Sequence, residues 1–549
     1  MTLFSNNNIH LLTLNRAVDV TISIVLRLRG RRIKKNLGIK NLLNIILVVI
    51  VFMYYTNAAY KYAIEPAIVS GDDSMYYIHV CLYFNPKSYI TEQYPNIIHY
   101  ACHIISQNDP IKAVFFFKIF TVINLYLLPI LASLIILRRG LEPLDAGLLC
   151  ILLVMTSPRY FQTFSDGSTM NIFGVNSLLL ALYFMATGNY FISGFILGVA
   201  TLHFYSIINF LVLIPFIPYL LGSRSKVIKL IQGVLLGAAP SIPKYIFLLY
   251  NILSGIPVVG IAVGIEKPNL IRLMAFSFTP YLLFTRFEFL GFLSFLIILS
   301  FLMVYYRRQN IFGRSLILSL LIYIITMLLL NVNPNIQDTA SVNLMYRLAR
   351  FLPLVTTMYI LFLIMQAKPV FSLRLPLLSL TLLLIIANYS CLWHTPGPLN
   401  RIENNAFYTL VEHRTEICSG KVIGISQVTS YLLVLCPNVT LIQTQQTYMR
   451  ASPADPQVIE GMLVLEKLRN YNVTALKSLG YEWIVLQEPL SDEWYDPSIK
   501  ELAISLVKNI DKFGKPVLII KNYDANIYII SLKTNCKIHT INTHEKCSG

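Results

Sequence analysis

The chain has 549 residues, of which 56% are hydrophobic and only 13% carry a charge. Soluble domains carry about 25% charged residues, so this composition excludes an ordinary soluble protein and indicates a membrane protein. The formal net charge of +17 does not indicate a nucleic-acid partner, because the basic residues fall in short clusters between apolar runs, as topology signals do. We therefore expect an integral, multi-pass protein of the cell membrane that binds no nucleic acid.

The first 40 residues form a basic tail. Its cations are Arg27, Arg29, Arg31, Arg32, Lys34, Lys35 and Lys40, and they place the N-terminus in the cytoplasm. The tail lacks a short apolar core with a small-residue cleavage site, so we expect no removable signal peptide. The first apolar run, Asn41 to Tyr55, is then an uncleaved anchor that carries the chain to the outer side.

An acidic stretch follows this first span. Asp72 and Asp73 precede Tyr76, Tyr77 and His79 by only a helical turn or two. Charged side chains near hydrocarbon are costly, so they tend to mark a functional site. The alternative is a solvated loop that happens to contain two acids.

The next apolar segments alternate between the two sides of the membrane. Two amphipathic segments, Met75 to Phe84 and Asn96 to Ile105, are expected to lie along the membrane surface as short helices. Further spans are predicted at Val114 to Leu137, Leu141 to Thr156 and Met170 to Ala186. A second outer loop, which contains Asp166, separates the last two.

The middle of the chain is less regular. Two short spans flank His203, and the apolar run from Leu230 to Leu253, which two prolines interrupt, is expected to cross once with a kink. The long outer segment from Gly255 to Glu288 contains Arg272 and Arg286, and loops of this length are commonly functional or disordered.

The last spans carry the chain out to the segment Tyr346 to Phe351, which contains Arg347 and Arg350, and back to the cytoplasm at Lys368. The apolar run from Leu375 to Trp393 then leads outside again. The sequence thus predicts about eleven crossings, with every basic cluster between apolar runs on the cytoplasmic side.

From about residue 396 the sequence changes character. Short β-branched runs alternate with helically periodic segments, which is typical of a small α/β domain with a largely parallel sheet. The predicted strands are Lys421–Ser426, Val439–Thr444, Trp483–Gln487, Pro516–Lys521 and Asn526–Leu532, and the predicted helices are Gln457–Asn470 and Ser498–Phe513. We therefore divide the chain into a cytoplasmic tail (1–40), a polytopic α-helical membrane domain (41–395) and a small exterior α/β domain (396–549).

The cysteines agree with this topology, because seven of the eight lie outside or near the outer surface. Candidate disulfide pairs are Cys418 with Cys436 and Cys536 with Cys547, although sequence alone does not fix connectivity. No C-x-x-C or H-E-x-x-H motif occurs, so a zinc site has little support.

The acids and cations that this topology gathers on the outer face suit an anionic lipid substrate. A carboxylate can take a proton from an acceptor hydroxyl, and arginine can hold a phosphate by paired hydrogen bonds. We predict Asp73 and Asp72 as catalytic residues, and the predicted substrate-binding residues are Arg347, Arg350, Asp166, His203, Tyr76, Tyr77, Arg272 and Arg286. The alternative for each arginine is a side chain that snorkels at the lipid interface, and for His203 it is a hydrogen-bonded histidine between helices.

This layout resembles the GT-C class of integral membrane glycosyltransferases, which includes polyprenyl-phosphate-sugar-dependent mannosyltransferases and oligosaccharyltransferase catalytic subunits. Asp72-Asp73 matches the acid of the first outer loop in that class. Phe164-Ser165-Asp166-Gly167 resembles the second-loop motif, with one acid where oligosaccharyltransferases usually have two, and Tyr346 to Phe351 resembles the arginine-bearing segment before a late span.

The resemblance implies transfer of a sugar from a polyprenyl-phosphate donor, with inversion and with the first-loop acid as general base. No W-W-D-Y-G motif occurs in the exterior domain, so a single sugar is expected rather than a whole oligosaccharide. The acceptor is a glycan, a lipid or a protein, and a divalent cation stays open as a cofactor. A transporter or flippase of lipid-linked sugars is the alternative, and an inactive scaffold is a third.

Overall fold

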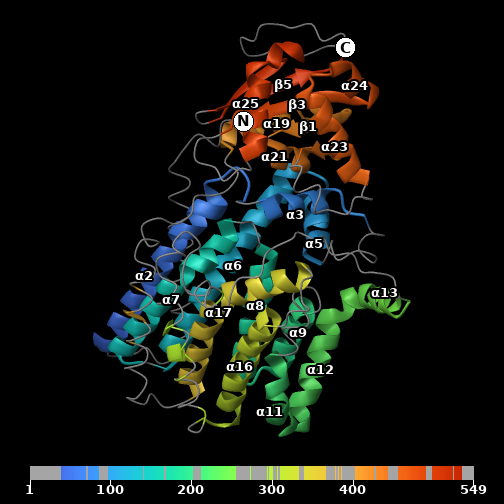
Figure 1. The fold of residues 1–549 in the computed structure, drawn as a ribbon. Helices are drawn as coiled ribbons and strands as arrows, with labels where there is room; N and C mark the ends of the chain where they lie inside the picture. Colours follow the sequence, from blue (N-terminus) through green and yellow to red (C-terminus); the bar gives the residue numbers. More distant parts are fainter. Residues whose placement is uncertain are drawn as a thin grey trace.

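The structure is a computed structural model. It describes residues 39–69, 72–85, 97–139, 141–165, 169–201, 212–254, 309–332, 339–366, 402–425, 428–442, 456–489, 497–522 and 525–533, with a few single positions in 273–306 and 378–385. Long helices occupy one end of the molecule and a small sheet with its own helices occupies the other (Figure 1).

The helical end is built from apolar helices that pack side by side. They are α2 (Ile39–Ala59), extended by the π-helix η1 (Tyr60–Ile64), then α6 (Pro110–Arg139), α7 (Pro143–Ser165), α8 (Thr169–Ala186), α9 (Tyr190–Thr201), α16 (Ile311–Val332) and α17 (Thr339–Gln366). One shared core of buried side chains joins them.

Four helices in the described ranges are long and apolar enough to cross a membrane: Asn41–Ile64, Pro110–Arg138, Thr169–Ala186 and Ile311–Val332. All four coincide with predicted spans, and the fourth is the one predicted to carry the chain out toward Tyr346 to Phe351. Shorter apolar helices occur at Pro143–Thr156, Tyr190–Ala200 and Leu348–Leu363. A membrane protein with several apolar helices is therefore supported, and the total of about eleven crossings stays a prediction.

Helix α6 has one exposed apolar face and one buried face. Its exposed apolar residues recur every four positions, at Ile111, Phe115, Ile119 and Ile123. This spacing puts them on one face of a helix. The opposite side, with Leu125, is buried in the shared core. The exposed stripe is the face that we expect to contact hydrocarbon.

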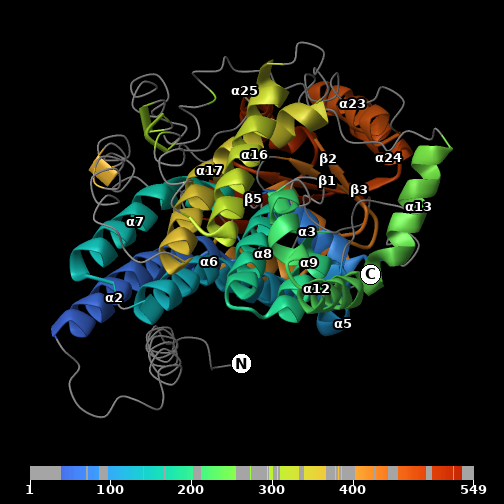
Figure 2. The ribbon, with the colours of Figure 1, turned by 90° about the horizontal axis from the view of Figure 1, so that it is seen from below.

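The contact between α9 and α12 (Arg224–Ala238) is made by backbone on backbone. A Cβ on Gly194 would lie 2.1 Å from the carbonyl oxygen of Leu230, and one on Gly198 would lie 2.4 Å from that of Val234. Gly233 and Gly237 face α9 with the same closeness. Small residues four apart allow this approach in membrane helices. Figure 2 shows α9 beside both α8 and α12.

The predicted kink between Leu230 and Leu253 lies at Pro240. Helix α12 ends there in the 3₁₀ turn η3 (Ala239–Ser241), and α13 (Ile242–Leu253) continues in a different direction (Figure 1). Proline has no backbone N–H to donate, and its ring clashes with the preceding turn, which explains the break. Before α12, the chain forms η2 (Ile214–Phe216) and α11 (Ile217–Leu221).

The sheet has the strand order β2-β1-β3-β5-β4. The strands are β1 (Lys421–Ile425), β2 (Val439–Leu441), β3 (Tyr481–Gln487), β4 (Leu518–Asn522) and β5 (Ala525–Ser531). Strands β1, β2 and β3 are parallel, as expected, whereas β5 is antiparallel to both β3 and β4. The two-residue connection between β4 and β5 explains the antiparallel pairing of these two strands, because so short a link joins only antiparallel neighbours.

Helices cover both faces of the sheet. Along β3, Ile484 and Leu486 face α23 (Pro456–Arg469), α24 (Val473–Ser478) and α25 (Pro497–Lys508), which the turn η6 (Ile510–Lys512) follows. Trp483 and Val485 face the other side, toward α19 (Asn404–Glu412) and α21 (Val428–Leu435). This alternation is the two-residue period of a strand.

The second of these faces continues into the membrane domain. The core that contains Trp483 and Val485 also contains Met75 and Ile78 of α3 (Asp72–Leu82) and Phe117 of α6. The sheet domain is therefore packed on the membrane domain through one continuous apolar core.

Candidate functional site

The acidic stretch lies where the two domains meet. Asp72 and Asp73 are the first two residues of α3 (Asp72–Leu82), so the helix begins three residues earlier than the sequence predicted. Both acids thus occupy the first turn, and the N-terminus of a helix favours negative charge. Their side chains lie outside the part that the structure describes.

The two tyrosines after the acids have different surroundings. The Tyr76 side chain is 46% exposed, whereas Tyr77 is only 5% exposed. The Tyr77 ring packs 5.6 Å from the ring of His99 and 6.5 Å from that of Phe117. The predicted role as a sugar-binding surface is therefore more compatible with Tyr76, since Tyr77 is a packing residue.

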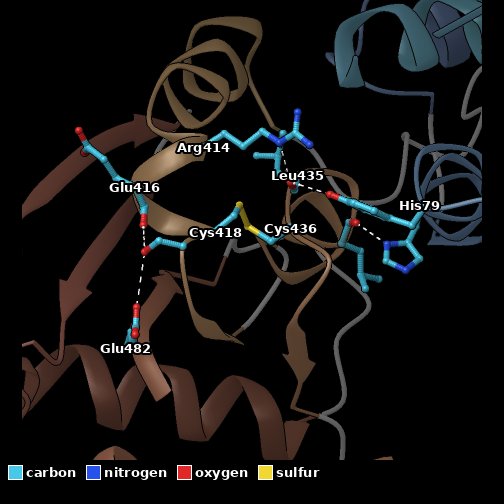
Figure 3. The surroundings of a disulfide bond; sticks show 10 residues. His79, Arg414, Glu416, Cys418, Leu435, Cys436 and Glu482 are labelled. Atoms are coloured by element: carbon cyan, nitrogen blue, oxygen red, sulfur yellow. Dashed lines mark hydrogen bonds between the residues drawn. A yellow bond between two sulfur atoms is a disulfide. The ribbon is translucent and has the colours of Figure 1, made fainter. Parts of the chain in front are cut away.

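The other end of α3 binds the end of α21, and we call this contact the α3–α21 junction. His79 Nδ1 donates to the carbonyl oxygen of Leu433 at 2.7 Å, and Tyr83 Oη donates to that of Leu435 at 2.9 Å. Arg414 Nε, from α20 (Arg414–Ile417), donates to the same Leu435 oxygen at 2.9 Å (Figure 3). The last carbonyls of a helix have no partner within it, so these side chains satisfy them.

Burial at the junction affects two titratable groups. It lowers the pKa of His79, and the hydrogen bond to Leu433 opposes this effect. It also raises the pKa of Tyr83, against the opposing influence of Arg414. Both pKa shifts favour the neutral forms of His79 and Tyr83. The donors at the junction are therefore a neutral imidazole, a neutral phenol and the guanidinium of Arg414.

Two disulfides flank the junction. Cys81–Cys102 joins α3 to α5 (Ile97–Ser106). Cys418–Cys436 joins the residue that follows α20 to the residue that follows α21 (Figure 3). The second pair is one that the sequence offered, whereas the first was missed. The candidate pair Cys536–Cys547 lies outside the described residues. In the described ranges the single free cysteine is Cys150, which is buried in α7.

Sequence reasoning also missed Lys118. This residue lies on α6, and its ammonium donates to the carbonyl oxygens of Ile64 at 3.3 Å and Pro66 at 2.7 Å. The signal was present, because Lys118 is the one charged residue in the apolar run from Ala113 to Ile136. A cation inside a span is by default a candidate for function.

The remaining predicted residues are distributed elsewhere. Asp166, His203, Arg272 and Arg286 lie outside the described residues. Arg347 and Arg350 lie inside α17 rather than before it, since that helix begins at Thr339. The Arg350 side chain is partly buried, and that of Arg347 is not described. The structure therefore brings the acids and tyrosines together on α3 and leaves the other predicted contacts untested.

A buried polar cluster lies inside the helical bundle. The carbonyl oxygen of Asn124 accepts hydrogen bonds from Tyr160 Oη at 2.7 Å and from Asn176 Nδ2 at 2.8 Å. Asn176 Nδ2 also lies 3.0 Å from Tyr160 Oη. Because these groups satisfy one another, the cluster joins α6, α7 and α8 without requiring a ligand.

Among the described side chains, no group of three or more His, Cys, Asp or Glu residues is placed to hold a metal ion. This says nothing of Asp72, Asp73 and Asp166, whose side chains are outside that set. A divalent cation therefore stays open.

Comparison with protein-family models and with curated protein sequences finds no match for this chain. The resemblance to GT-C glycosyltransferases thus rests on the layout and the motifs of the chain itself.

Proposed function

We propose that this chain is a membrane glycosyltransferase that moves a sugar from a polyprenyl-phosphate donor to an acceptor on the outer face. An acid at the start of α3, Asp73 or failing that Asp72, would act as general base. The acceptor class is a glycan, a lipid or a protein.

The observation that carries this proposal is the position of α3. Its N-terminus bears both acids, and its middle packs against α6 through Tyr77 and Phe117. Its C-terminal half binds α21 through His79, and Tyr83, the residue that follows α3, binds α21 as well. An acid on this helix is thus next to both the membrane domain, which can bind a lipid donor, and the exterior domain, which can bind an acceptor.

The disulfides support an exterior location for this end of the molecule. Both described disulfides flank the α3–α21 junction, and disulfides persist in oxidising compartments. The segment from Arg224 to Lys229 is one of the basic clusters predicted to be cytoplasmic. Helix α12 begins with this cluster, after the turn that follows α11. The orientation with the N-terminus inside and the sheet domain outside is part of the proposal.

The proposed step is a displacement at the anomeric carbon. The acceptor hydroxyl oxygen forms the new bond, the bond from carbon to the phosphate oxygen breaks, and polyprenyl phosphate leaves with that electron pair. The carboxylate takes the hydroxyl proton. Arg347 or Arg350 is proposed to stabilise the leaving phosphate by paired hydrogen bonds.

The test is a transfer assay with the purified full chain and radiolabelled polyprenyl-phosphate sugars, read as label in lipid, glycan or peptide. Removal of a general base usually costs about 100- to 10,000-fold in rate. We expect Asp73→Asn to lose activity to that extent while the thermal unfolding midpoint stays unchanged, and Asp72→Asn to be milder.

The matched control is Asp511→Asn, which makes the same chemical change at an exposed position of the sheet domain and should transfer like the parent. Full activity in both single variants and in the double variant would remove the base from α3, and Asp166 would then be the next candidate. A parent that moves lipid-linked sugar across vesicles without transfer would instead support a flippase.

A further inference from the structure

The end of the first span is held by a cation from another helix. After α2 and η1, the chain leaves the helix at Glu65, and the Lys118 ammonium binds the carbonyl oxygens of Ile64 and Pro66 at 3.3 and 2.7 Å. The C-terminal end of a helix carries a partial negative charge, so a cation is favourable there. This contact fixes where the ammonium lies.

The contact does not neutralise the charge. An ammonium has three N–H donors, and two of them are used by carbonyl oxygens, which carry no formal charge. In the described part of the chain no carboxylate forms an ion pair with Lys118. One donor and the full positive charge are therefore available to an anion.

The surroundings show where such an anion would come from. Lys118 is partly buried and lies between Phe115 and Ile119 in sequence, which are 63% and 45% exposed on the lipid-facing stripe of α6. Lys118 lies about 12 Å along α6 from the first residue of that helix, Pro110, at a rise of about 1.5 Å per residue. An unpaired charge beside hydrocarbon is costly, and the phosphate of a lipid is the anion that can reach it from this side.

We propose that Lys118 binds the phosphate of the lipid-linked donor, at the point where the lipid-facing stripe of α6 meets the end of η1. The identity of the lipid rests on the proposed function. The preceding residue, Phe117, packs against Tyr77 of α3, so a phosphate on Lys118 lies beside the helix that begins with the two acids. The charge-assisted hydrogen bond provides affinity, and the two carbonyl contacts orient the ammonium.

The binding test uses the full chain in neutral detergent with a short-chain polyprenyl phosphate, compared with the matching polyprenol. Loss of a hydrogen bond to a charged group corresponds to about a tenfold to hundredfold weaker affinity. We expect Lys118→Gln to weaken phosphate-lipid binding by that factor and to leave polyprenol binding unchanged, while Lys118→Arg retains most of the affinity.

The matched control is Lys112→Gln. Lys112 is exposed in the first turn of the same helix, so this variant removes the same charge and should bind like the parent. Equal affinity of Lys118→Gln and the parent for polyprenyl phosphate would overturn the proposal and leave Lys118 as a helix-end contact alone.

A second measurement needs only the parent protein, so it holds even where Lys118→Gln fails to fold. Amine-reactive labelling of Lys118, read by mass spectrometry, should be slowed by polyprenyl phosphate but not by polyprenol or by vesicles of an anionic phospholipid. Absence of protection, or equal protection by the phospholipid, contradicts the proposal. Protection without sugar transfer would remove the proposed glycosyltransferase function and retain the phosphate site.

Discussion

Two contacts in this molecule are built in opposite ways. In the contact between α9 and α12, glycines let the two backbones touch, with Gly198 facing the carbonyl oxygen of Val234. In the α3–α21 junction, long side chains such as His79 and Tyr83 reach across to backbone carbonyls, and disulfides stand on either side.

The difference follows from the surroundings of each contact. Helices α9 and α12 lie in the part of the chain that is predicted to cross the membrane. There, lipid tails are as apolar as the side chains, so close packing replaces hydrophobic burial as the source of stability. At the junction, burial of apolar side chains such as Met75 and Val485 in one core provides stability, and hydrogen bonds orient the elements. A substitution should therefore act through added volume in the first contact and through lost side-chain bonds in the second.

The largest effect is expected from Gly198→Ala. The added Cβ would lie 2.4 Å from the carbonyl oxygen of Val234, so the backbones must move apart. We expect a loss of more than about 3 kcal/mol, seen as a lower thermal unfolding midpoint in detergent.

The matched control for this prediction is Gly147→Ala on α7. Its new Cβ would meet nothing nearer than 3.8 Å, from the side chain of Leu47. Alanine also favours a helix by up to about 1 kcal/mol over glycine, so this variant should unfold at the parent temperature or above. Equal destabilisation of the two variants would show that close packing is not what distinguishes the α9–α12 contact.

The next effect concerns the disulfide between α3 and α5. Replacing Cys81 and Cys102 together with serine opens a link across 21 residues, for which a loss of about 3 kcal/mol is typical. We expect a lower unfolding midpoint and faster proteolysis of the sheet domain, because α3 is the element on which α21 packs.

A reducing agent supplies the control for the disulfide variant. It should lower the midpoint of the parent further than that of the double serine variant, which retains only Cys418–Cys436 among the described pairs. If the double variant and the parent unfold together under oxidising conditions, the α3–α21 junction does not depend on this link.

The same contrast explains how much the sequence could predict. Strand β1 was predicted within one residue of its observed end at Ile425, because a β-branched run and its turn are local signals. The α3–α21 junction was not predicted, since the His79 hydrogen bond joins residues 354 positions apart. No local pattern carries such a pairing.

The candidate site divides in the same manner. The acidic pair was visible because two carboxylates after a span are rare in sequence, and its place at the start of α3 is now known. Lys118 was equally visible as a lone cation in an apolar run. Its partners, the carbonyls of Ile64 and Pro66, became evident only when α6 was packed beside η1.

The smallest expected effect is a pH dependence of the α3–α21 junction. Burial lowers the pKa of His79 in the folded protein below its ordinary value, which is about 6.5 in an unfolded chain. The unfolded state therefore binds a proton more readily, and the contribution of His79 to stability is fully present above about pH 6.5 and is lost as the pH falls. The other titratable or charged groups at this contact are Tyr83, whose pKa burial raises further above this range, and the guanidinium of Arg414.

The measurement is the unfolding midpoint of the parent and of His79→Gln between neutral and mildly acidic pH. Glutamine can still donate an amide hydrogen to the Leu433 carbonyl but does not titrate. At neutral pH the two proteins should unfold within a few degrees of each other, and only the parent should lose the part of its stability that His79 contributes as the solution becomes acidic. The remaining histidines are the same in both proteins, so the difference between the two curves isolates His79. If the unfolding midpoints of the two proteins change in parallel with pH, the His79 imidazole can be protonated within the junction without loss of stability. The hydrogen bond to Leu433 would then be the whole of its contribution.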